Sequence, residues 1–551
     1  MNVSDTSRRR FLRTVGGFGL APLCSRIDLL AWLQAERRFS GDNVDEAHRL
    51  LTDPDAVLAS APREPHPQRY DVIIVGAGIS GLTAGYLLRG MNTVVLEREA
   101  EPGGVSRLES WNGIEYAIGA AYVIDPDPGS GDAREKRTFE LLEELGLRSA
   151  GEDLSRDRSK SRRLGGDANH CVFSRRRVVP EREIYSPRNV RFFKAVLDSD
   201  NYPAVPPENA RLVAALDRVS FREFLNAPAL QRQWYARTAG AISPLGWEAI
   251  EYYFWGAFGA TAAETSAYHG LNFFAAEFGD ILVYPGGNGF ITRRLAERIA
   301  KDKPGMLQTG SYVLRIARDP AGGFQVLAYR DGRIHDYRAA AVIFASPLFL
   351  AGKLVADLPA AQREAIAGLT YRAYAVANVL LRRPIERIFR HPAFQHGYEL
   401  TPVHGFPVGK ADTRELSQRK VFSDAVVADF PVWRHPDRAV LTVYRPYPYD
   451  GGRADLLSAA YGDLEAEVRR AVLELFGPHG LKAGDIEDVR IARWGHPMIV
   501  ARPGQLADDS LRRAAAAQPG LYFAHTDVNG APAFENAIAA AFDVVDAITC
   551  G

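Results

Sequence analysis

A strand–turn–helix–strand unit with a glycine-rich turn, over residues 70–97, constrains this chain more than any other feature. Residues 70–75 are rich in β-branched side chains, which is typical of a buried parallel strand, and residues 93–96 repeat the pattern. Between them lie three glycines in the spacing G-x-G-x-x-G and a helical segment over residues 82–89. This unit predicts an α/β fold that binds a dinucleotide.

The residues of the turn have separate physical roles. Gly76 permits the tight turn after the strand, Gly78 lets backbone N–H groups come close to a pyrophosphate, and Gly81 lets helix and strand pack together. The amino terminus of the helix offers unpaired N–H donors and a positive dipole to the phosphates. We therefore expect nucleotide contacts at Gly76, Gly78, Ile79, Ser80 and Gly81.

The second strand of the unit ends on an acidic residue. Glu97 lies 21 residues after Gly76, where a carboxylate can accept hydrogen bonds from both ribose hydroxyls. Arg98 follows it directly, and we expect it at the same site. A strand, a helix, a second strand and a terminal acid in this order favour a nucleotide site over an ordinary glycine-rich loop.

Composition excludes several other classes of protein. The chain has 551 residues, too many for one compact core. Its 67 basic and 67 acidic residues balance, so nothing indicates a nucleic acid or an anionic membrane as partner. The 3 cysteines and 12 histidines form no CxxC, CxxCH or HExxH pattern, and we expect no metal site. No stretch is long and apolar enough for an integral membrane segment.

Further motifs follow in an order that resembles the flavin-containing amine oxidase and phytoene desaturase superfamily. The segment 103–107 resembles the family's loop around the pyrophosphate, with the arginine displaced, and residues 118–122 resemble the segment beside the flavin. A strand over residues 311–316 resembles the one whose backbone meets the adenine, and blocks at 284–289 and 341–347 fit the same order. The resemblance implies FAD as the cofactor, with contacts at Gly103, Gly104, Arg107, Gly119, Ala120, Ala121 and Val313.

Residues 521–538 resemble the family's closing strand, turn and helix. Asp527 matches the acid that the family bonds to the ribityl–phosphate region, while His525 and Thr526 replace the usual glycine. The helix carries small residues from Ala537 onward, which permit a close approach to the flavin. Its amino-terminal dipole would stabilise the reduced, anionic flavin.

The expected architecture is α/β, with a Rossmann-like FAD-binding domain interleaved with an α+β substrate-binding domain. The FAD-binding domain is expected over residues 69–130, 281–352 and 501–551. The substrate-binding domain is expected over residues 131–280 and 353–500. We interpret residues 35–68 as one or two short helices and a linker, and residues 1–34 as an export signal.

The signal is inferred from the basic start of the chain. Residues 7–13 read Ser-Arg-Arg-Arg-Phe-Leu-Arg, and a mildly apolar, glycine-containing stretch follows over residues 15–23. This resembles a twin-arginine signal and predicts a periplasmic or exported protein. The alternative is a disordered basic tail on a cytoplasmic protein.

The substrate half is rich in aromatic residues over 247–258 and 268–274. Such runs form core more often than pocket, so we expect a minority to line the substrate site. In the family, a tryptophan–proline segment passes near the flavin. Trp494 would wall the pocket there, and His496 would accept a proton unless it is structural.

The resemblance implies oxidation of an amine by hydride transfer to flavin N5, with a polyamine as the first candidate substrate. Glu248, Glu251 and Glu264 are candidates for an acidic pocket entrance. Many family members activate oxygen through a lysine on the strand that corresponds to residues 371–380. This strand lacks lysine here, so we expect a separate electron acceptor.

Three other functions remain open. The first is a desaturase or isomerase of an apolar, lipid-like substrate, which would need a wide apolar tunnel. The second is an L-amino-acid oxidase, which would need an arginine such as Arg372 or Arg493 to hold a carboxylate. The third is a flavoprotein without catalytic activity, whose flavin would be sealed from any substrate cavity.

Overall fold

The computed structural model describes residues 39–130, 132–149, 162–165, 170–404, 406, 422–429, 434–448 and 451–550. Contacts divide the chain into two units, Met1–Phe39 and Ser40–Gly551. Of the first unit only Phe39 is described, so the predicted signal over residues 1–34 lies outside the described residues. The second unit carries both sheets discussed below.

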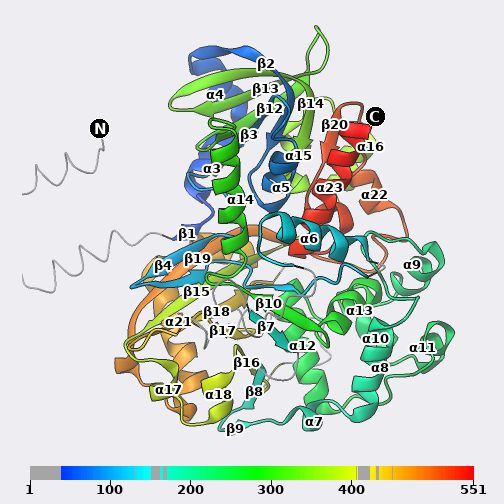
Figure 1. Ribbon diagram of the computed structural model, residues 1–551, viewed down its shortest axis with the longest axis vertical. Coiled ribbons are helices and arrows are strands. Elements are labelled where there is room, and N and C mark those ends of the chain that lie inside the picture. The colour runs from blue at the N-terminus through cyan, green and yellow to red at the C-terminus, as the bar shows by residue number, and fades with distance from the viewer. Residues whose placement is uncertain are drawn as a thin grey trace, which may run out of the picture. The chain divides into compact units, whose positions relative to one another are not determined.

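A seven-stranded sheet contains the predicted dinucleotide unit (Figure 1). Five strands are parallel, and β12 and β13 form an antiparallel extension. The strand order is β11 (Leu307–Gln308), β3 (Thr93–Leu96), β2 (Arg63–Val75), β14 (Arg333–Phe344), β13 (Phe324–Arg330) and β12 (Tyr312–Arg318), with β20 (Leu521–Phe523) paired to β14.

Helices cover both faces of this sheet because alternate residues of its strands point to opposite sides. Val72 and Ile74 of β2 pack in one core, and Ile73 and Val75 pack in another. The first core is closed by α5 (Ile79–Leu87), α6 (Ala133–Glu144), α14 (Gly289–Asp302) and α23 (Phe534–Cys550). The second is closed by α15 (Leu348–Leu354), α16 (Ala360–Ala367) and α22 (Ser510–Ala514). The predicted α/β class is confirmed.

An eight-stranded, mainly antiparallel sheet forms the second large layer. Its long strand β15 is buried at all 11 residues. The order is β1 (Ser40–Gly41), β19 (Ile486–Ile499), β15 (Tyr371–Leu381), β18 (Ala439–Pro446), β17 (Ala425–Val427), β16 (Glu399–Pro402), β8 (His170–Ser174) and β9 (Arg177–Val178). We propose that the two large sheets mark the two interleaved domains.

Helices between residues 187 and 276 pack around a core rich in aromatic residues. They are α8 (Pro187–Leu197), α9 (Ala210–Leu216), α10 (Phe221–Leu225), α11 (Pro228–Trp234), α12 (Pro244–Phe258) and α13 (Ala267–Ala276). Two small sheets are also present. One contains β6 (Tyr122–Ile124), β10 (Asp280–Val283) and β7 (Arg162–Gly165), and the other pairs β4 (Leu108–Trp111) with β5 (Ile114–Ala117).

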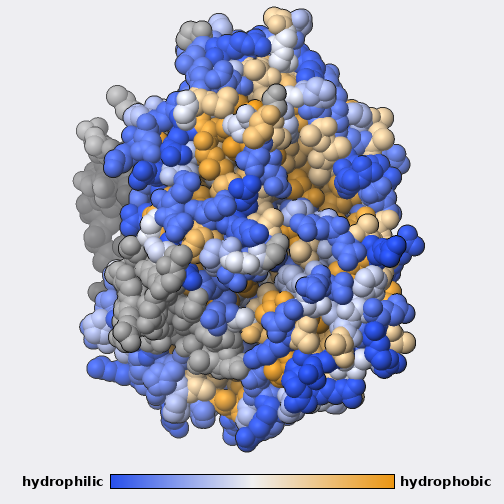
Figure 2. Space-filling model, turned by 45° about the vertical axis from the view of Figure 1, so that its right-hand side comes forward, coloured by the Kyte–Doolittle hydropathy of each residue, from blue (hydrophilic) through white to orange (hydrophobic). Residues whose placement is uncertain are grey.

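The other described helices are short, apart from α21. They are α7 (Glu181–Ile184), α17 (Ile385–Ile388), α18 (Pro392–His396), α20 (Gly452–Ser458), α21 (Tyr461–Phe476), η1 (Gly477–His479), η2 (Ala483–Asp485) and η3 (Thr526–Asn529). On the face in Figure 2, hydrophilic residues cover much of the surface, with apolar patches between them. Within the described residues, no helix has the length and apolar character needed to cross a membrane.

The segment before residue 69 contains the two short helices predicted for it, but it packs on the folded unit and is not a linker. It forms α3 (Val44–Thr52) and α4 (Pro54–Ser60), and β2 already begins at Arg63. Side chains of Asn43 and Asp53 cap the two helices. Leu50 and Leu58 are buried against the β12–β14 part of the large sheet. The apolar residues of these helices therefore make the segment part of the folded unit.

Candidate active site

A cavity of about 240 Å³ lies against the glycine-rich turn. It is bordered by the turn between β2 and α5, by the end of β3 and by the loop after β14. The following residues predicted to hold the cofactor line this cavity: Gly76, Gly78, Ile79, Ser80, Glu97, Arg98, Gly103, Gly104, Arg107, Ala120, Val313 and Ala537. We call it the cofactor cavity.

The turn has the geometry that a dinucleotide requires. Gly76 has φ +103°, and a Cβ there would lie 2.5 Å from Ser346 Oγ. A Cβ on Gly81 would lie 1.9 Å from the Gly76 carbonyl oxygen, so Gly81 packs the turn and does not line the cavity. No side chain caps the amino terminus of α5 at Gly78. Its N–H groups therefore suit an anionic ligand, and the turn fits the pyrophosphate of FAD.

The buried Glu97 carboxylate is held by the backbone on both sides. Oε2 accepts a hydrogen bond from the Ala77 N–H at 2.6 Å, and Oε1 accepts one from the Glu99 N–H at 2.9 Å. Each oxygen keeps further lone-pair capacity toward the cavity that Glu97 lines. The fixed carboxylate fits the ribose contact predicted for it.

The Gly103–Gly104 loop closes over the turn. The Gly103 N–H donates to the Ala77 carbonyl oxygen at 2.7 Å, and a Cβ on Gly104 would lie 3.1 Å from Gly78 Cα. Arg107 supports this loop because its Nε donates to the Gly104 carbonyl oxygen at 3.0 Å. The displaced arginine of the motif therefore still reaches the predicted site.

A larger cavity of about 410 Å³ adjoins the cofactor cavity. Gly119 and Ala121 line it, while Ala120 borders both spaces. The residues shared by the two cavities are Val105, Ala120, Trp494, Pro497, Pro532, Ala533 and Phe534. We call the larger space the substrate cavity, because it meets the cofactor cavity along this shared wall.

Trp494 lies in the shared wall, as predicted, and its indole N–H donates to the Ile118 carbonyl oxygen at 2.7 Å. His496 lines the cofactor cavity but not the substrate cavity. Its ring stacks on Phe349 with centroids 4.1 Å apart. Burial, with a further contribution from the nearby Arg453 charge, lowers the pKa of His496 to about 3. A histidine so weakly basic does not suit the role of proton acceptor predicted for it.

Asp527 does not reach the cofactor cavity. Its Oδ2 accepts hydrogen bonds from the Tyr371 hydroxyl at 2.6 Å and from the Leu348 N–H at 2.8 Å. Its Oδ1 lies 2.9 Å from His525 Nδ1. His525 and Thr526 line the cavity in its place. The altered turn therefore places Asp527 behind His525. The predicted contact between Asp527 and the cofactor is wrong.

A minority of the aromatic run reaches the substrate cavity. Tyr252, Tyr253, Phe273 and Phe274 line it, whereas Trp255 is fully buried in the core. Five tyrosines from other chain segments add hydroxyl groups to a mainly apolar wall. The full set is Tyr122, Tyr185, Tyr252, Tyr253, Tyr374, Tyr398 and Tyr444.

Five acidic side chains of the described chain line this cavity: Glu181, Glu277, Glu399, Asp424 and Glu535. Glu277 follows α13, Glu399 begins β16, and Asp424 precedes β17. The hydroxyls of Tyr122 and Tyr253 donate to Glu277 Oε1 at 3.2 and 3.0 Å. Among the described residues, no group bonds to Glu277 Oε2, which leaves this oxygen for a ligand.

Glu399 and Asp424 are also held by neighbouring side chains. Glu399 Oε1 accepts a hydrogen bond from the Thr401 hydroxyl at 3.1 Å and lies 3.7 Å from His170 Nε2. The Ser423 hydroxyl donates to Asp424 Oδ1. Three segments distant in the sequence therefore present fixed carboxyl groups to one cavity.

Burial raises the pKa of Glu277 to about 8, and the negative charge of Glu399 raises it further in the same direction. Burial followed by the same Glu399 charge raises the pKa of Asp424 to about 7. Carboxyl groups in this setting hold protons near neutral pH unless a cation replaces them. The cavity wall is thus suited to a positively charged ligand.

The acids expected near the aromatic run have other partners. Glu251 is buried, with Oε1 3.1 Å from Arg222 Nη2 and Oε2 accepting a hydrogen bond from the Ala262 N–H. Glu264 pairs with Arg372 at 2.8 Å. Neither acid lines the substrate cavity, and neither do Glu248, Arg372 and Arg493. The acidic residues of the cavity were missed because they come from segments without a motif.

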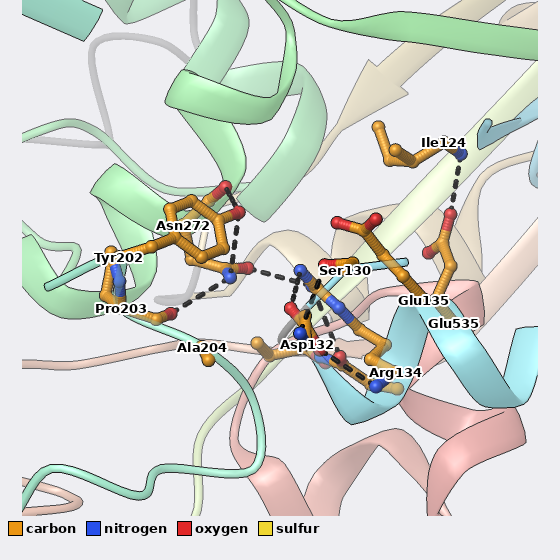
Figure 3. Close-up of polar contacts among 12 residues, drawn as sticks. Ile124, Ser130, Asp132, Arg134, Glu135, Tyr202, Pro203, Ala204, Asn272 and Glu535 are labelled. Carbon is orange, nitrogen blue, oxygen red and sulfur yellow. Dashed lines mark hydrogen bonds and ion pairs between the residues drawn. The ribbon is translucent and has the colours of Figure 1, made fainter. Parts of the chain in front are cut away.

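Arg134 is the arginine in the substrate-cavity wall of the described chain, and its charge is already matched. Its guanidinium donates to Asp132 Oδ2 at 3.0 Å and to Asn272 Oδ1 at 2.9 Å (Figure 3). Glu535, at the start of α23, accepts a hydrogen bond from the Ile124 N–H at 2.8 Å. Among the described residues no cluster of histidine, cysteine and acidic side chains is arranged to hold a metal ion.

Comparison with known proteins places this geometry in a family. Residues 79–549 match the family described as flavin containing amine oxidoreductase. The oxidoreductase PigB of a Serratia species is 24% identical over 531 residues, which cover 88% of this chain and 76% of that protein.

Solved structures with the same fold include two amine oxidases. A variant of putrescine oxidase has a TM-score of 0.60 at 18% identity, covering 89% of this chain and 100% of that one. Cyclohexylamine oxidase from Brevibacterium oxydans has a TM-score of 0.58 at 17% identity, covering 87% and 99%. With the family match over most of the chain and a cavity that fits FAD, this chain belongs to the flavin-containing amine oxidoreductases and is an FAD-dependent oxidoreductase.

Proposed function

We propose that this enzyme oxidises an amine that carries a second cationic nitrogen, such as a diamine or polyamine. The observation that supports this most directly is the group of Glu277, Glu399 and Asp424 in the wall of the substrate cavity. An ammonium group placed among them replaces the protons that Glu277 and Asp424 otherwise retain. Binding of the cation then offsets the cost of burying negative charge.

The aromatic wall supports the same substrate class. Rings of Tyr253, Tyr374 and Tyr444 line the cavity, and aromatic faces attract cations where water is excluded. The methylene chain of a diamine packs on these rings while its ends remain polar. The reacting carbon would lie at the shared wall of Trp494 and Phe534, where the two cavities meet.

The proposed reaction removes a hydride from the carbon next to nitrogen. The C–H bond breaks, both electrons leave with the hydrogen, and water hydrolyses the resulting iminium to a carbonyl compound and ammonia, or to a shorter amine where the oxidised nitrogen is secondary. FAD, when bound, accepts the hydride and its two electrons. The protein contributes positioning and a dry wall, and needs little acid–base catalysis.

The alternatives receive less support from the cavity. An L-amino-acid oxidase needs a free arginine for the substrate carboxylate, whereas Arg134 is paired with Asp132. A sealed flavin without catalysis does not fit two cavities with a common wall. An apolar lipid-like substrate would offer no positive charge to the three carboxyl groups.

We also propose that electrons leave the enzyme to an acceptor other than oxygen. No lysine lines either cavity in the described part of the chain, and the family's oxygen-activating device uses one. A dye acceptor such as dichlorophenolindophenol should support turnover at least tenfold faster than air does. Equal rates with oxygen and the dye would contradict this proposal.

Export remains a proposal that rests on the sequence around residues 7–23. Residues 1–38 fused to a reporter that is active only outside the cytoplasm should confer activity through the twin-arginine route. Replacing Arg8 and Arg9 by lysine should abolish reporter activity. Unchanged reporter activity in that variant would argue against the signal.

The substrate proposal is tested by comparing three ligands of equal chain length. With a dye acceptor, kcat/KM should be highest for 1,4-diaminobutane, about tenfold lower for n-butylamine, and lowest for 4-aminobutanoate. In Asp424→Asn the preference for the diamine over butylamine should shrink. A preference for butylamine or for 4-aminobutanoate would contradict the acidic subsite.

A further inference from the structure

The segment immediately before α3 is built into the cofactor site. Strand β1 (Ser40–Gly41) pairs in parallel with β19, with Gly41 opposite Arg493. Gly41 has φ +90°, and a Cβ there would lie 2.4 Å from the Arg493 carbonyl oxygen. The Asp42 N–H donates to that same carbonyl at 3.0 Å. The segment is therefore seated closely on β19.

From this position Asp42 connects the two large sheets. Its Oδ1 accepts a hydrogen bond from Arg98 Nη2 at 2.5 Å, beside the end of β3. Its Oδ2 accepts one from the Gly495 N–H at 2.9 Å, on β19 between Trp494 and His496. Asp42 also lines the cofactor cavity. One carboxylate thus joins the dinucleotide unit to the strand that forms the shared wall.

Gly41, next to Asp42, orients Arg107, the second arginine of the cofactor cavity. The Gly41 carbonyl oxygen accepts a hydrogen bond from Arg107 Nη2 at 2.5 Å. Arg107 also bonds to Gly104 and lies over the Trp494 ring at 5.2 Å. Among the described residues, Arg98 and Arg107 are the arginines that line the cofactor cavity. Both are therefore oriented by the segment that precedes α3.

We infer that residues 40–43 complete the cofactor site and that Asp42 is a positioning residue for its ADP end, acting through Arg98. Arginine side chains lose rotational freedom when they bind an anion, and a partner that holds them in place beforehand reduces that loss. Asn43 adds to the docking because its N–H donates to Glu99 Oε1 at 3.1 Å. The inference concerns cofactor retention and does not depend on the substrate proposed above.

The test is a binding titration of apoprotein with FAD, followed by flavin fluorescence. Asp42→Asn should raise the dissociation constant for FAD about tenfold, because a charge-assisted hydrogen bond is lost. Gly41→Ala should raise it at least as much by displacing β1. Asp45→Asn is the matched control, because it removes an exposed carboxylate three residues away; its dissociation constant should stay within twofold of the wild type.

Two further measurements separate positioning from general stability. ADP carries the diphosphate without the flavin ring, so its affinity should fall by the same factor in Asp42→Asn. Arg98→Gln combined with Asp42→Asn should weaken FAD binding by much less than the product of the single effects. The urea midpoint of the apoprotein should be unchanged in Asp42→Asn.

Either of two results would overturn the inference. One is unchanged binding of FAD and ADP in both Asp42→Asn and Gly41→Ala. The other is a loss of FAD affinity in Asp42→Asn that is accompanied by an equal loss of apoprotein stability, together with a double variant, Asp42→Asn with Arg98→Gln, whose loss of affinity equals the product of the two single effects. Neither outcome depends on which substrate the enzyme oxidises.

Discussion

Glu277 keeps its proton to about pH 8 because it is buried and lies near the negative charge of Glu399. Tyr122, Tyr253 and Glu535 also face it. The usual pKa of this side chain is 4.5, so the folded protein binds the proton more tightly than the unfolded chain. The stability that this proton contributes is complete below pH 4.5 and is lost as the pH rises through 8.

Glu277→Gln should remove that loss. Thermal unfolding of the holoenzyme should show similar stability for variant and wild type at pH 5. At pH 9 the variant should be more stable by about 1–3 kcal/mol. Glu143→Gln, on the exposed side of α6, should follow the wild type at both values. A constant difference across the pH range would show that Glu277 does not titrate in this way.

Unlike Glu277, His496 should contribute no ionisation to the pH dependence that is measured. Its pKa of about 3 leaves the ring neutral throughout the physiological range, and it lies against Phe349 in the cofactor cavity. His496→Asn should therefore leave the pH profile of kcat between pH 6 and 9 unchanged in shape, although its height falls less than about tenfold. If the pH profile of the variant lacked an ionisation that the wild type shows, His496 would be the proton acceptor after all.

Among the elements, the turn between β2 and α5 imposes a strict geometric requirement. A methyl group on Gly81 would lie 1.9 Å from the Gly76 carbonyl oxygen, so Gly81→Ala forces the strand and helix apart. The purified variant should contain less than about a tenth of the FAD of the wild type, measured by absorbance after gel filtration. Gly90→Ala, just after α5, meets nothing within 4 Å and should retain its FAD. Full FAD content in Gly81→Ala would contradict this account of the turn.

The elements of the cofactor half could be predicted from sequence because few residues satisfy their geometry. Positive φ and close backbone contact require glycine at Gly76, Gly103 and Gly104. The position of Glu97, directly after β3, follows from the distance that a contact with the ribose requires. Asp527 was misplaced because His525 and Thr526 replace a glycine, and the histidine side chain now occupies the position toward the cavity.

The substrate half could be predicted only in outline. Aromatic density indicated where its core lies, since most of α12 is buried. Glu277, Glu399 and Asp424 come from a helix end and the starts of two strands, and no spacing relates them. Their proximity arises from the pairing of β16 with β17 and from the packing of α13, which sequence periodicity does not report. The linker was also misjudged, because Leu50 and Leu58 are buried.

At the scale of the whole molecule, the eight-stranded sheet and helix α23, which packs on the seven-stranded sheet, both contribute to the shared wall of the two cavities. Trp494 comes from β19 and Phe534 from the start of α23. Asp42 bonds to both sides through Arg98 and Gly495. Substrate and cofactor are thereby brought to one boundary inside the unit Ser40–Gly551. An acidic, aromatic cavity on one side of that boundary is the basis of the function proposed here.

The most direct test mixes the FAD-loaded enzyme with 1,4-diaminobutane in the absence of oxygen and follows the absorbance of oxidised flavin near 450 nm. The diamine should bleach the flavin rapidly and completely, and n-butylamine at the same concentration should bleach it at least about tenfold more slowly. If dithionite bleaches the flavin while no amine does, the acidic cavity does not serve amine oxidation and the central proposal fails.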